Sequence, residues 1–254
     1  MSLLYTNPPA ALINTYLEQN KSQSSVINFT LLLIKTLYFC DMIIDIEIAK
    51  QVAKSLLQIN AIILQAKNPF TWASGWKSPI YCDNRKILSF PESRTFIRQS
   101  LVNILQKKYG GSNIIAGVAT GAIAHGALVA EEMGLPFIYV RSKKKDHGKQ
   151  NIIEGSYTSG QTVIVIEDLI SSGKSSIEAI ESLKESGLIV KGLISIFTYG
   201  FDIAIENFKK VNCDFISLCD YRTLLQESLK QDYINKDDID TLERWRENPS
   251  KWTK

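Results

Sequence analysis

The sequence has few of the residues that build metal centres and disulfide frameworks. Its 254 residues include four cysteines and two histidines. No two cysteines form a Cys-x-x-Cys pair, and neither histidine stands at metal-ligand spacing from a cysteine. The pattern indicates small buried or half-buried thiols rather than metal ligands, and it favours a reducing, cytoplasmic location.

The N-terminal region lacks an apolar run of membrane-spanning length. Its stretch from Phe29 to Cys40 is interrupted by Lys35, which leaves far fewer than the ~20 apolar residues that a membrane span needs. The stretch also lies too far from the N-terminus for a signal peptide, and no small-residue cleavage site follows it. We therefore expect no membrane partner.

Neither sign of charge dominates the chain. The 29 basic and 26 acidic residues give a formal net charge of +3. A nucleic-acid-binding domain tends to show a strong basic stripe, so we expect no nucleic-acid partner. The positive charge gathers once, in residues 141–149.

Residues 1–41 differ in composition from the remainder. They are rich in Asn, Gln, Ser and Thr, with the breakers "NPPA" and "NKSQSS". We expect residues 1–41 to be an N-terminal extension that is either poorly ordered or not translated, with Met42 as the working initiator. Residues 42–254 would then form the folded domain.

Apolar strands alternate with helical segments along the rest of the chain. Continuous Val/Ile/Leu strands separated by helices predict an α/β fold, in which helices flank both faces of a mostly parallel central sheet. The spacing predicts helices over 45–57, 92–108, up to Met133, 175–186, 202–210 and 221–247, and strands over 113–118, 136–140, 162–166, 191–197 and 214–218.

The stretch "VIVIEDLISSGKSS", Val163 to Ser176, combines an apolar strand, two acids and a small polar loop. A nucleotide-triphosphate P-loop needs a glycine five positions before its second glycine. Counting back from Gly173 gives Asp168, a carboxylate that would repel a triphosphate. The P-loop interpretation therefore fails.

The same residues suit a different ligand. Glu167 and Asp168 follow the buried strand, at the edge where open α/β sheets bind ligands. The next residues turn into a helix, whose free N–H groups suit a phosphate monoester. Carboxylates accept hydrogen bonds from neighbouring sugar hydroxyls. The pattern predicts a ribose 5-phosphate site.

This stretch resembles the motif by which type I phosphoribosyltransferases bind phosphoribosyl diphosphate (PRPP). The resemblance implies their fold, including an N-terminal hood segment. It implies that Glu167 and Asp168 hold the ribose 2- and 3-hydroxyls, with Asp168 catalytic, and that the phosphate loop binds the 5-phosphate. The PRPP-binding residues that follow the acids are Leu169, Ile170, Ser171, Ser172, Gly173, Lys174 and Ser175.

A second stretch, "YVRSKKKDHGKQNIIEG", carries the positive charge directly after a strand. Alone, it is typical of a solvated loop. Its pattern R-x-x-x-K-D-H-G resembles the catalytic loop of the orotate phosphoribosyltransferase family. The resemblance implies that Arg141, Lys145 and His147 contact PRPP, and that Lys145 and His147 are catalytic. In this family the loop closes over the partner subunit's site, which implies a homodimer.

A third stretch, "NPFTWASGWKSPIYCDNRK" (68–86), resembles the segment that partly covers orotate in this family. We expect Lys77 and Arg85 to contact orotate together with Ser171. Some members carry a lysine where this chain has Ala73, so that lysine contact is absent or supplied otherwise.

The stretch "GVATG" (117–121) resembles the loop that holds the diphosphate, through Ala119, Thr120 and Gly121. Relatives often have a lysine where this chain has Gly121. We expect a strained, cis peptide near Ala119–Thr120. We expect His125, further along, to be a buried core histidine.

The resemblance implies transfer of ribose 5-phosphate from PRPP to orotate, in pyrimidine synthesis. Mg²⁺ would be held mainly by PRPP and not directly by protein residues. Two alternatives stay open: a purine phosphoribosyltransferase, and a regulator that senses PRPP without catalysis.

Overall fold

A six-stranded sheet forms the centre of the unit made by residues 43–254. The structure is a computed structural model, which describes residues 42–72, 75–141 and 152–252. The strand order is β10-β9-β8-β5-β6-β7, and neighbours run parallel except for β7, which is antiparallel to β6. This confirms the predicted mostly parallel sheet. The strands are β5 (Ile114–Val118), β6 (Phe137–Val140), β7 (Ile153–Glu154), β8 (Thr162–Ile170), β9 (Ile189–Thr198) and β10 (Phe215–Asp220).

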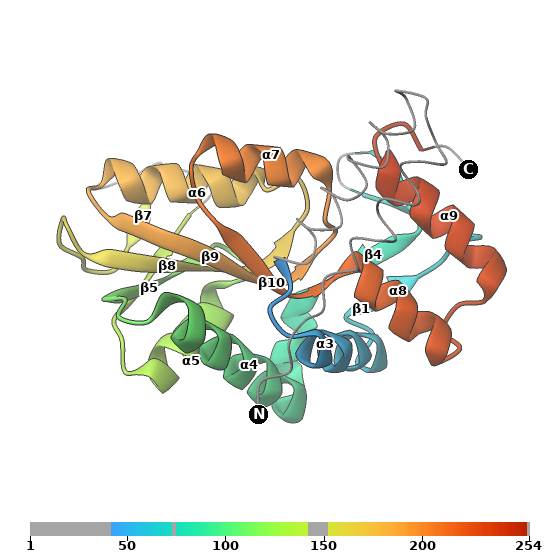
Figure 1. Ribbon diagram of the computed structural model, residues 1–254, viewed down its shortest axis with the longest axis horizontal. Helices are drawn as coiled ribbons and strands as arrows, with labels where there is room; N and C mark the ends of the chain where they lie inside the picture. Colours follow the sequence, from blue (N-terminus) through green and yellow to red (C-terminus); the bar gives the residue numbers. More distant parts are fainter. Residues whose placement is uncertain (1–41, 73–74, 142–151, 253–254) are drawn as a thin grey trace, which may run out of the picture. The chain divides into compact units, whose positions relative to one another are not determined.

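Helices cover both faces of this sheet (Figure 1). Strands that are covered on both faces have to be apolar throughout, as β5 and β8 are along most of their length. The helix ends predicted for 45–57, 92–108, 175–186 and 202–210 lie within one residue of the observed ones. No helix in the described part of the chain is long and apolar enough to span a membrane. One face carries α3 (Ile46–Gln58), α4 (Pro91–Tyr109) and α5 (Ile123–Met133), and the other carries α6 (Lys174–Glu185) and α7 (Asp202–Lys210).

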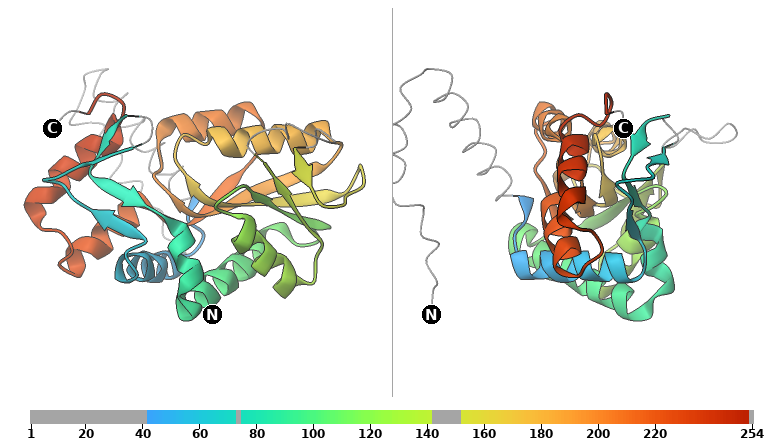
Figure 2. Two further views of the ribbon diagram at one scale, coloured as in Figure 1. Left: turned by 180° about the vertical axis from the view of Figure 1, so that it is seen from behind. Right: turned by 90° about the vertical axis from the view of Figure 1, so that its right-hand side faces the viewer.

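The expected hood segment consists of two short antiparallel strand pairs and a 3₁₀ helix. β1 (Ile62–Leu64) pairs with β4 (Ile80–Cys82), and β2 (Phe70–Thr71) pairs with β3 (Lys77–Ser78). The 3₁₀ helix η1 follows over Asn84–Ser89. Figure 2 shows these strands on the side of α3 and the C-terminal helices, away from β7.

The C-terminal segment differs from the expectation of one helical stretch over 221–247. The structure has two helices, α8 (Tyr221–Lys230) and α9 (Lys236–Glu247). Asp232 lies between them with a φ of 57°, a left-handed conformation that does not continue a helix. Asn235 then begins α9 as the N-cap of a capping box. The prediction was wrong because polar capping residues, rather than apolar spacing, set this boundary.

β8 is longer than predicted. The expected strand ends at Ile166, but β8 continues to Ile170 because Leu169 and Ile170 pair with β9. On its other side, β8 pairs with β5 only as far as Ile166. Glu167 and Asp168 therefore lie within a strand, and not in a loop that follows it.

A cluster of aromatic rings joins α9 to the sheet and to the hood segment. Trp245 of α9 is fully buried. Its ring centroid lies 5.5–5.7 Å from those of Trp72, Tyr199, Phe201 and Tyr221. Aromatic pairs at these separations stabilise a core beyond the area that they bury. The cluster therefore fixes the hood segment, through Trp72, to the end of β9.

We expect Trp245→Ala to lower the free energy of unfolding by about 3–5 kcal/mol, the usual cost of removing a buried aromatic side chain. Tyr233→Ala is the matched control, because Tyr233 is 46% exposed. Urea unfolding of both variants checks the prediction. Equal, small losses for the two variants would contradict it.

Candidate active site

β5 and β8 are neighbours in the sheet, and the connections that follow them run in opposite directions. β5 leads through α5 to β6 on one side, and β8 leads through α6 to β9 on the other. Open α/β sheets bind ligands at such a switch point, outside the carboxyl ends of the strands. The residues that the structure brings to this edge are the predicted diphosphate loop, after β5, and the acid pair in β8.

The loop after β5 has the predicted unusual backbone. The peptide between Ala119 and Thr120 is cis, which confirms the expectation. The N–H of Ala119 donates to the carbonyl of Val140 on β6 at 2.8 Å. His125 on α5 is 3% exposed, as predicted for a core histidine, and its burial lowers its pKa.

Glu167 and Asp168 point to opposite faces of β8, because successive residues of a strand alternate. Glu167 is 4% exposed. Its Oε2 accepts a hydrogen bond from Oγ of Ser176 on α6 at 2.9 Å, and its Oε1 accepts one from the N–H of Asp168 at 3.0 Å. Burial, followed by the charge of Asp168, raises the pKa of Glu167 well above its ordinary value.

Asp168 lies against the diphosphate loop. A Cβ added at Gly121 would come within 2.6 Å of Oδ1 of Asp168, closer than real Cβ contacts come. The absence of a side chain at Gly121 is therefore what gives the Asp168 carboxylate its place in this structure. The same contact brings the acid of β8 and the loop after β5 together.

The phosphate loop turns tightly into α6. Gly173 adopts a φ of 77° and stands directly before the helix, whose first N–H groups have no side-chain cap. Free N–H groups at a helix N-terminus favour an anion. A cavity of about 320 Å³ opens here, lined by Leu169, Glu178 and the five loop residues Ser171, Ser172, Gly173, Lys174 and Ser175.

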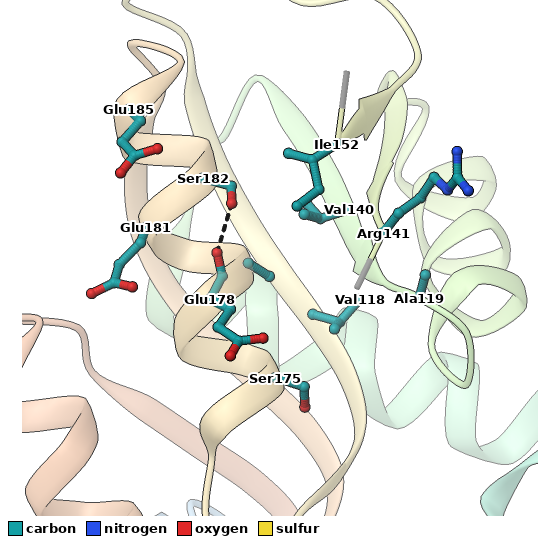
Figure 3. A pocket seen from close by; sticks show the side chains of 11 residues that line it. Val118, Ala119, Val140, Arg141, Ile152, Ser175, Glu178, Glu181, Ser182 and Glu185 are labelled. Carbon is teal, nitrogen blue, oxygen red and sulfur yellow. Dashed lines mark hydrogen bonds between the residues drawn. The ribbon is translucent and has the colours of Figure 1, made fainter. Parts of the chain in front are cut away.

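A second cavity, of about 370 Å³, adjoins the first, since Ser175 and Glu178 line both. It runs between α6 and the ends of β5 and β6, and it includes Ala119 and Arg141 (Figure 3). The Arg141 guanidinium lies 3.4 Å from Oε1 of Glu154. The acid side of this cavity consists of Glu178, Glu181 and Glu185.

The two predicted orotate contacts from the hood segment have partners within that segment. Nζ of Lys77 donates to Oγ1 of Thr71 at 2.7 Å. Arg85 donates to both carboxylate oxygens of Asp83, at 2.7 and 3.0 Å. Hydrogen bonding to Asp83 raises the pKa of Arg85, and the charge of Asp168 adds to the shift. Arg85 is therefore within electrostatic reach of Asp168, whose contribution is smaller than that of Asp83.

Three of the predicted positions, Lys145, His147 and Ala73, lie outside the described residues. The structure places Arg141, the first residue of the R-x-x-x-K-D-H-G pattern, at the end of β6 beside the diphosphate loop.

The comparisons agree with this geometry. A sequence model of the phosphoribosyl transferase domain matches residues 84–200. The chain is 53% identical over 203 residues to the orotate phosphoribosyltransferase of Phocaeicola vulgatus, which covers 80% of this chain and 96% of the relative. It is 52% identical over 205 residues to that of Cytophaga hutchinsonii, over 81% of this chain and 98% of the relative.

A solved structure shows the same fold. The crystal structure of orotate phosphoribosyltransferase from Aeropyrum pernix superimposes with a TM-score of 0.64 at 27% identity, over 72% of this chain and 99% of that one. The chain belongs to the orotate phosphoribosyltransferase family. It is a pentosyltransferase of pyrimidine biosynthesis.

Three side chains that the sequence did not single out hold the PRPP motif of this orotate phosphoribosyltransferase. Ser176 binds Glu167 and stands within the motif itself, so its proximity could have been found. Asn84 and Asn207 donate to the carbonyls of Asp168 and Ser172. Both asparagines are distant in sequence, and no local pattern links them to the motif.

The raised pKa of Glu167 predicts how the stability of the orotate phosphoribosyltransferase depends on pH. The folded protein holds this proton more tightly than the unfolded chain, so the free energy of unfolding falls as the pH rises above the ordinary glutamate value of 4.5. We expect Glu167→Gln to reduce that fall. Urea unfolding between pH 5 and pH 8 measures it. Exposed Glu181→Gln is the control, and an equal pH slope in the wild type and Glu167→Gln would contradict the prediction.

The contact between Gly121 and Asp168 predicts a selective loss of activity. The backbone of Gly121 does not adopt the left-handed region, so alanine fits its conformation but displaces the carboxylate. We expect Gly121→Ala to lower kcat/KM by about 10²-fold, the scale of a small misplacement in a site, with little change in Tm. Gly110→Ala is the control, because its Cβ would make an ordinary 3.5 Å contact. Activity retained in Gly121→Ala would refute the assigned place of Asp168.

Proposed function

We propose that the chain joins N1 of orotate to C1 of PRPP, where the bond to diphosphate breaks, and so forms orotidine 5-monophosphate. The observation that carries this proposal is the adjacency of the acid pair, the diphosphate loop and the phosphate loop at one switch point. Each of these segments suits one part of PRPP.

The ribose 5-phosphate occupies the edge between β8 and α6. Asp168 and Glu167 accept hydrogen bonds from the ribose hydroxyls, and Asp168 is the more accessible of the two. The 5-phosphate binds the phosphate loop at the free N–H groups of α6, where the helix dipole favours an anion. Positive charge that develops on the ribose in the transition state is stabilised by the nearby carboxylate.

The diphosphate lies between Ala119–Gly121 and the loop that begins at Arg141. Arg141, Lys145 and His147 offset the negative charge of the leaving group, and closure of the loop excludes water. The chain forms a homodimer in which this loop closes over the partner subunit's site. Support comes from the R-x-x-x-K-D-H-G pattern and from Arg141 beside the diphosphate loop.

Orotate binds against the hood segment, with Ser171, Lys77 and Arg85 as its contacts. The electrostatic reach between Arg85 and Asp168 supports this arrangement. Within the described residues, no cluster of three or more His, Cys, Asp or Glu side chains could hold a metal. Mg²⁺ would be held mainly by PRPP and not directly by protein residues, since Mg²⁺ commonly binds substrate phosphates and keeps several of its waters. When bound, it neutralises charge on the diphosphate.

Residues 42–254 form the catalytic domain, and residues 1–41 are an extension of it. The curated relatives support this division, because they match 79–82% of this chain and 94–100% of their own length. The three described cysteines are free thiols, which supports a reducing, cytoplasmic location. Mass spectrometry of the protein from its native host would test the extension, and a peptide containing Leu3–Tyr5 would show that it is translated.

The activity is tested by orotate-depletion absorbance with PRPP and Mg²⁺. We expect turnover with orotate and none with adenine or hypoxanthine. Preference for a purine base would favour a purine phosphoribosyltransferase. PRPP binding without turnover, together with a PRPP-dependent shift of DNA, would favour the regulator.

Lys145→Ala should lower kcat by about 10²-fold or more, the scale of losing one preorganised charge contact. Lys143→Ala is the matched control, since it removes a neighbouring charge at one of the variable positions of the R-x-x-x-K-D-H-G pattern. The measurement is kcat of each variant by steady-state kinetics. Near-normal turnover of Lys145→Ala would remove the loop from the mechanism.

A further inference from the structure

Two asparagines from outside the PRPP motif each hold one backbone carbonyl within it. Nδ2 of Asn84 donates to the carbonyl of Asp168 at 2.6 Å. Nδ2 of Asn207 donates to the carbonyl of Ser172 at 3.1 Å. The first bond is made at the acid that faces the ribose, and the second at the loop that faces the phosphate.

The carbonyl of Asp168 lies beyond the point where β8 stops pairing with β5. β5 pairs with β8 only as far as Ile166, so Asp168 has no β5 partner in the register. Asn84 is the first residue of η1, which follows the hood strand β4; it is 1% exposed and fills this place. A partly buried backbone carbonyl without a partner would cost free energy, so this bond is part of what keeps Asp168 in an extended strand.

The orientation of the Asn84 amide is fixed from its other side. Its Oδ1 accepts from Sγ of Cys82 at 3.5 Å, which leaves the NH₂ group to face Asp168. Asn84 therefore links the hood segment and β8 at one point, and a residue that lacks a donor there could not replace it.

Asn207 acts on the phosphate loop from α7. The neighbouring residue Phe208 packs against Gly173, where an added Cβ would lie 2.9 Å from a ring carbon. The carbonyl of Ser172 and the N–H of Gly173 belong to one planar trans peptide, so they point in opposite directions. By holding the carbonyl on the α7 side, Asn207 turns the N–H of Gly173 to the opposite side.

We propose that Asn84 and Asn207 are positioning residues for PRPP, one for each half of its ribose 5-phosphate. Asn84 sets the backbone that carries the Asp168 carboxylate, and Asn207 sets the N–H groups of the phosphate loop. Neither side chain touches the substrate. The inference rests on the proposed function, because it takes the diol site and the phosphate site from there.

The two residues predict different kinetic losses. Asp168 acts on charge that develops in the transition state, so its displacement lowers kcat. The 5-phosphate is held equally before and during the reaction, so a looser phosphate loop raises KM for PRPP and leaves kcat almost unchanged.

The experiment measures kcat and KM for PRPP in Asn84→Ala, Asn84→Asp and Asn207→Ala, each with its Tm. Removal of one buried hydrogen bond should lower kcat about tenfold in both Asn84 variants, and raise KM for PRPP about tenfold in Asn207→Ala with kcat within about twofold. Asn84→Asp keeps the size and the acceptor for Cys82 but loses the donor. If Asn84→Ala does not fold, this isosteric variant decides the first half of the proposal.

Asn113→Ala is the matched control. Oδ1 of Asn113 accepts from the N–H and Oγ1 of Thr162, at 2.9 and 2.8 Å, and so joins β5 to β8 at the opposite, amino end of the strands. We expect it to lower Tm without changing kcat or KM. If Asn113→Ala shows kinetic losses as large as those in the Asn84 and Asn207 variants, a general loss of stability would explain all of them. That outcome would overturn the proposal.

Asp168→Ala separates this inference from the proposed function. Unchanged PRPP binding by calorimetry in Asp168→Ala would mean that the diol site is assigned wrongly, and the proposed function would fail with the inference. Loss in Asp168→Ala, combined with normal kinetics in the Asn84 and Asn207 variants, would overturn the inference alone.

Discussion

The site depends on β8 continuing after β5 has stopped pairing with it. β9 pairs with β8 as far as Ile170. β5 pairs with β8 only as far as Ile166, and the chain after β5 forms the diphosphate loop. Glu167 and Asp168 are thereby held on a rigid strand with one open edge. A loop in the same place would offer the same carboxylates without fixing them, and catalytic geometry tolerates little displacement. The phosphate loop and the diphosphate loop are both positioned by this part of β8, from Glu167 to Ile170.

Two adjacent carboxylates would repel a ligand that carries a phosphate and a diphosphate, and the burial of one of them reduces this repulsion. Glu167 is enclosed between β8 and α6, where Ser176 binds it and its pKa is raised. The raised pKa favours the protonated form of Glu167, and Asp168 is the more accessible of the two side chains. In the proposed function, Asp168 serves the ribose diol, and the burial of Glu167 limits the repulsion of the phosphates. Strongly shifted groups are common at functional sites for such reasons.

The sequence predicts those features that depend on neighbours along the chain. Apolar spacing predicts the ends of four helices to within a residue, and the acids, the small loop and the following helix predict the ligand class. It does not predict that β8 continues to Ile170, because that extension depends on pairing with β9. It does not predict the turn at Asp232 either, where local capping overrides apolar spacing. Pairing between distant strands and polar capping are both hard to predict from the spacing of apolar residues.

The two asparagines that bind the backbone of the PRPP motif are also long-range features that neighbours along the chain do not predict. Asn84 precedes Asp168 by 84 residues, and Asn207 follows Ser172 by 35, so each bond forms only when the hood segment or α7 docks. The motif supplies carboxylates and N–H groups, but distant side chains decide the direction in which its backbone presents them. A chain could therefore keep every residue of "VIVIEDLISSGKSS" and still bind PRPP poorly. Membership of this family specifies the chemistry of the site, and the two docked asparagines specify its geometry.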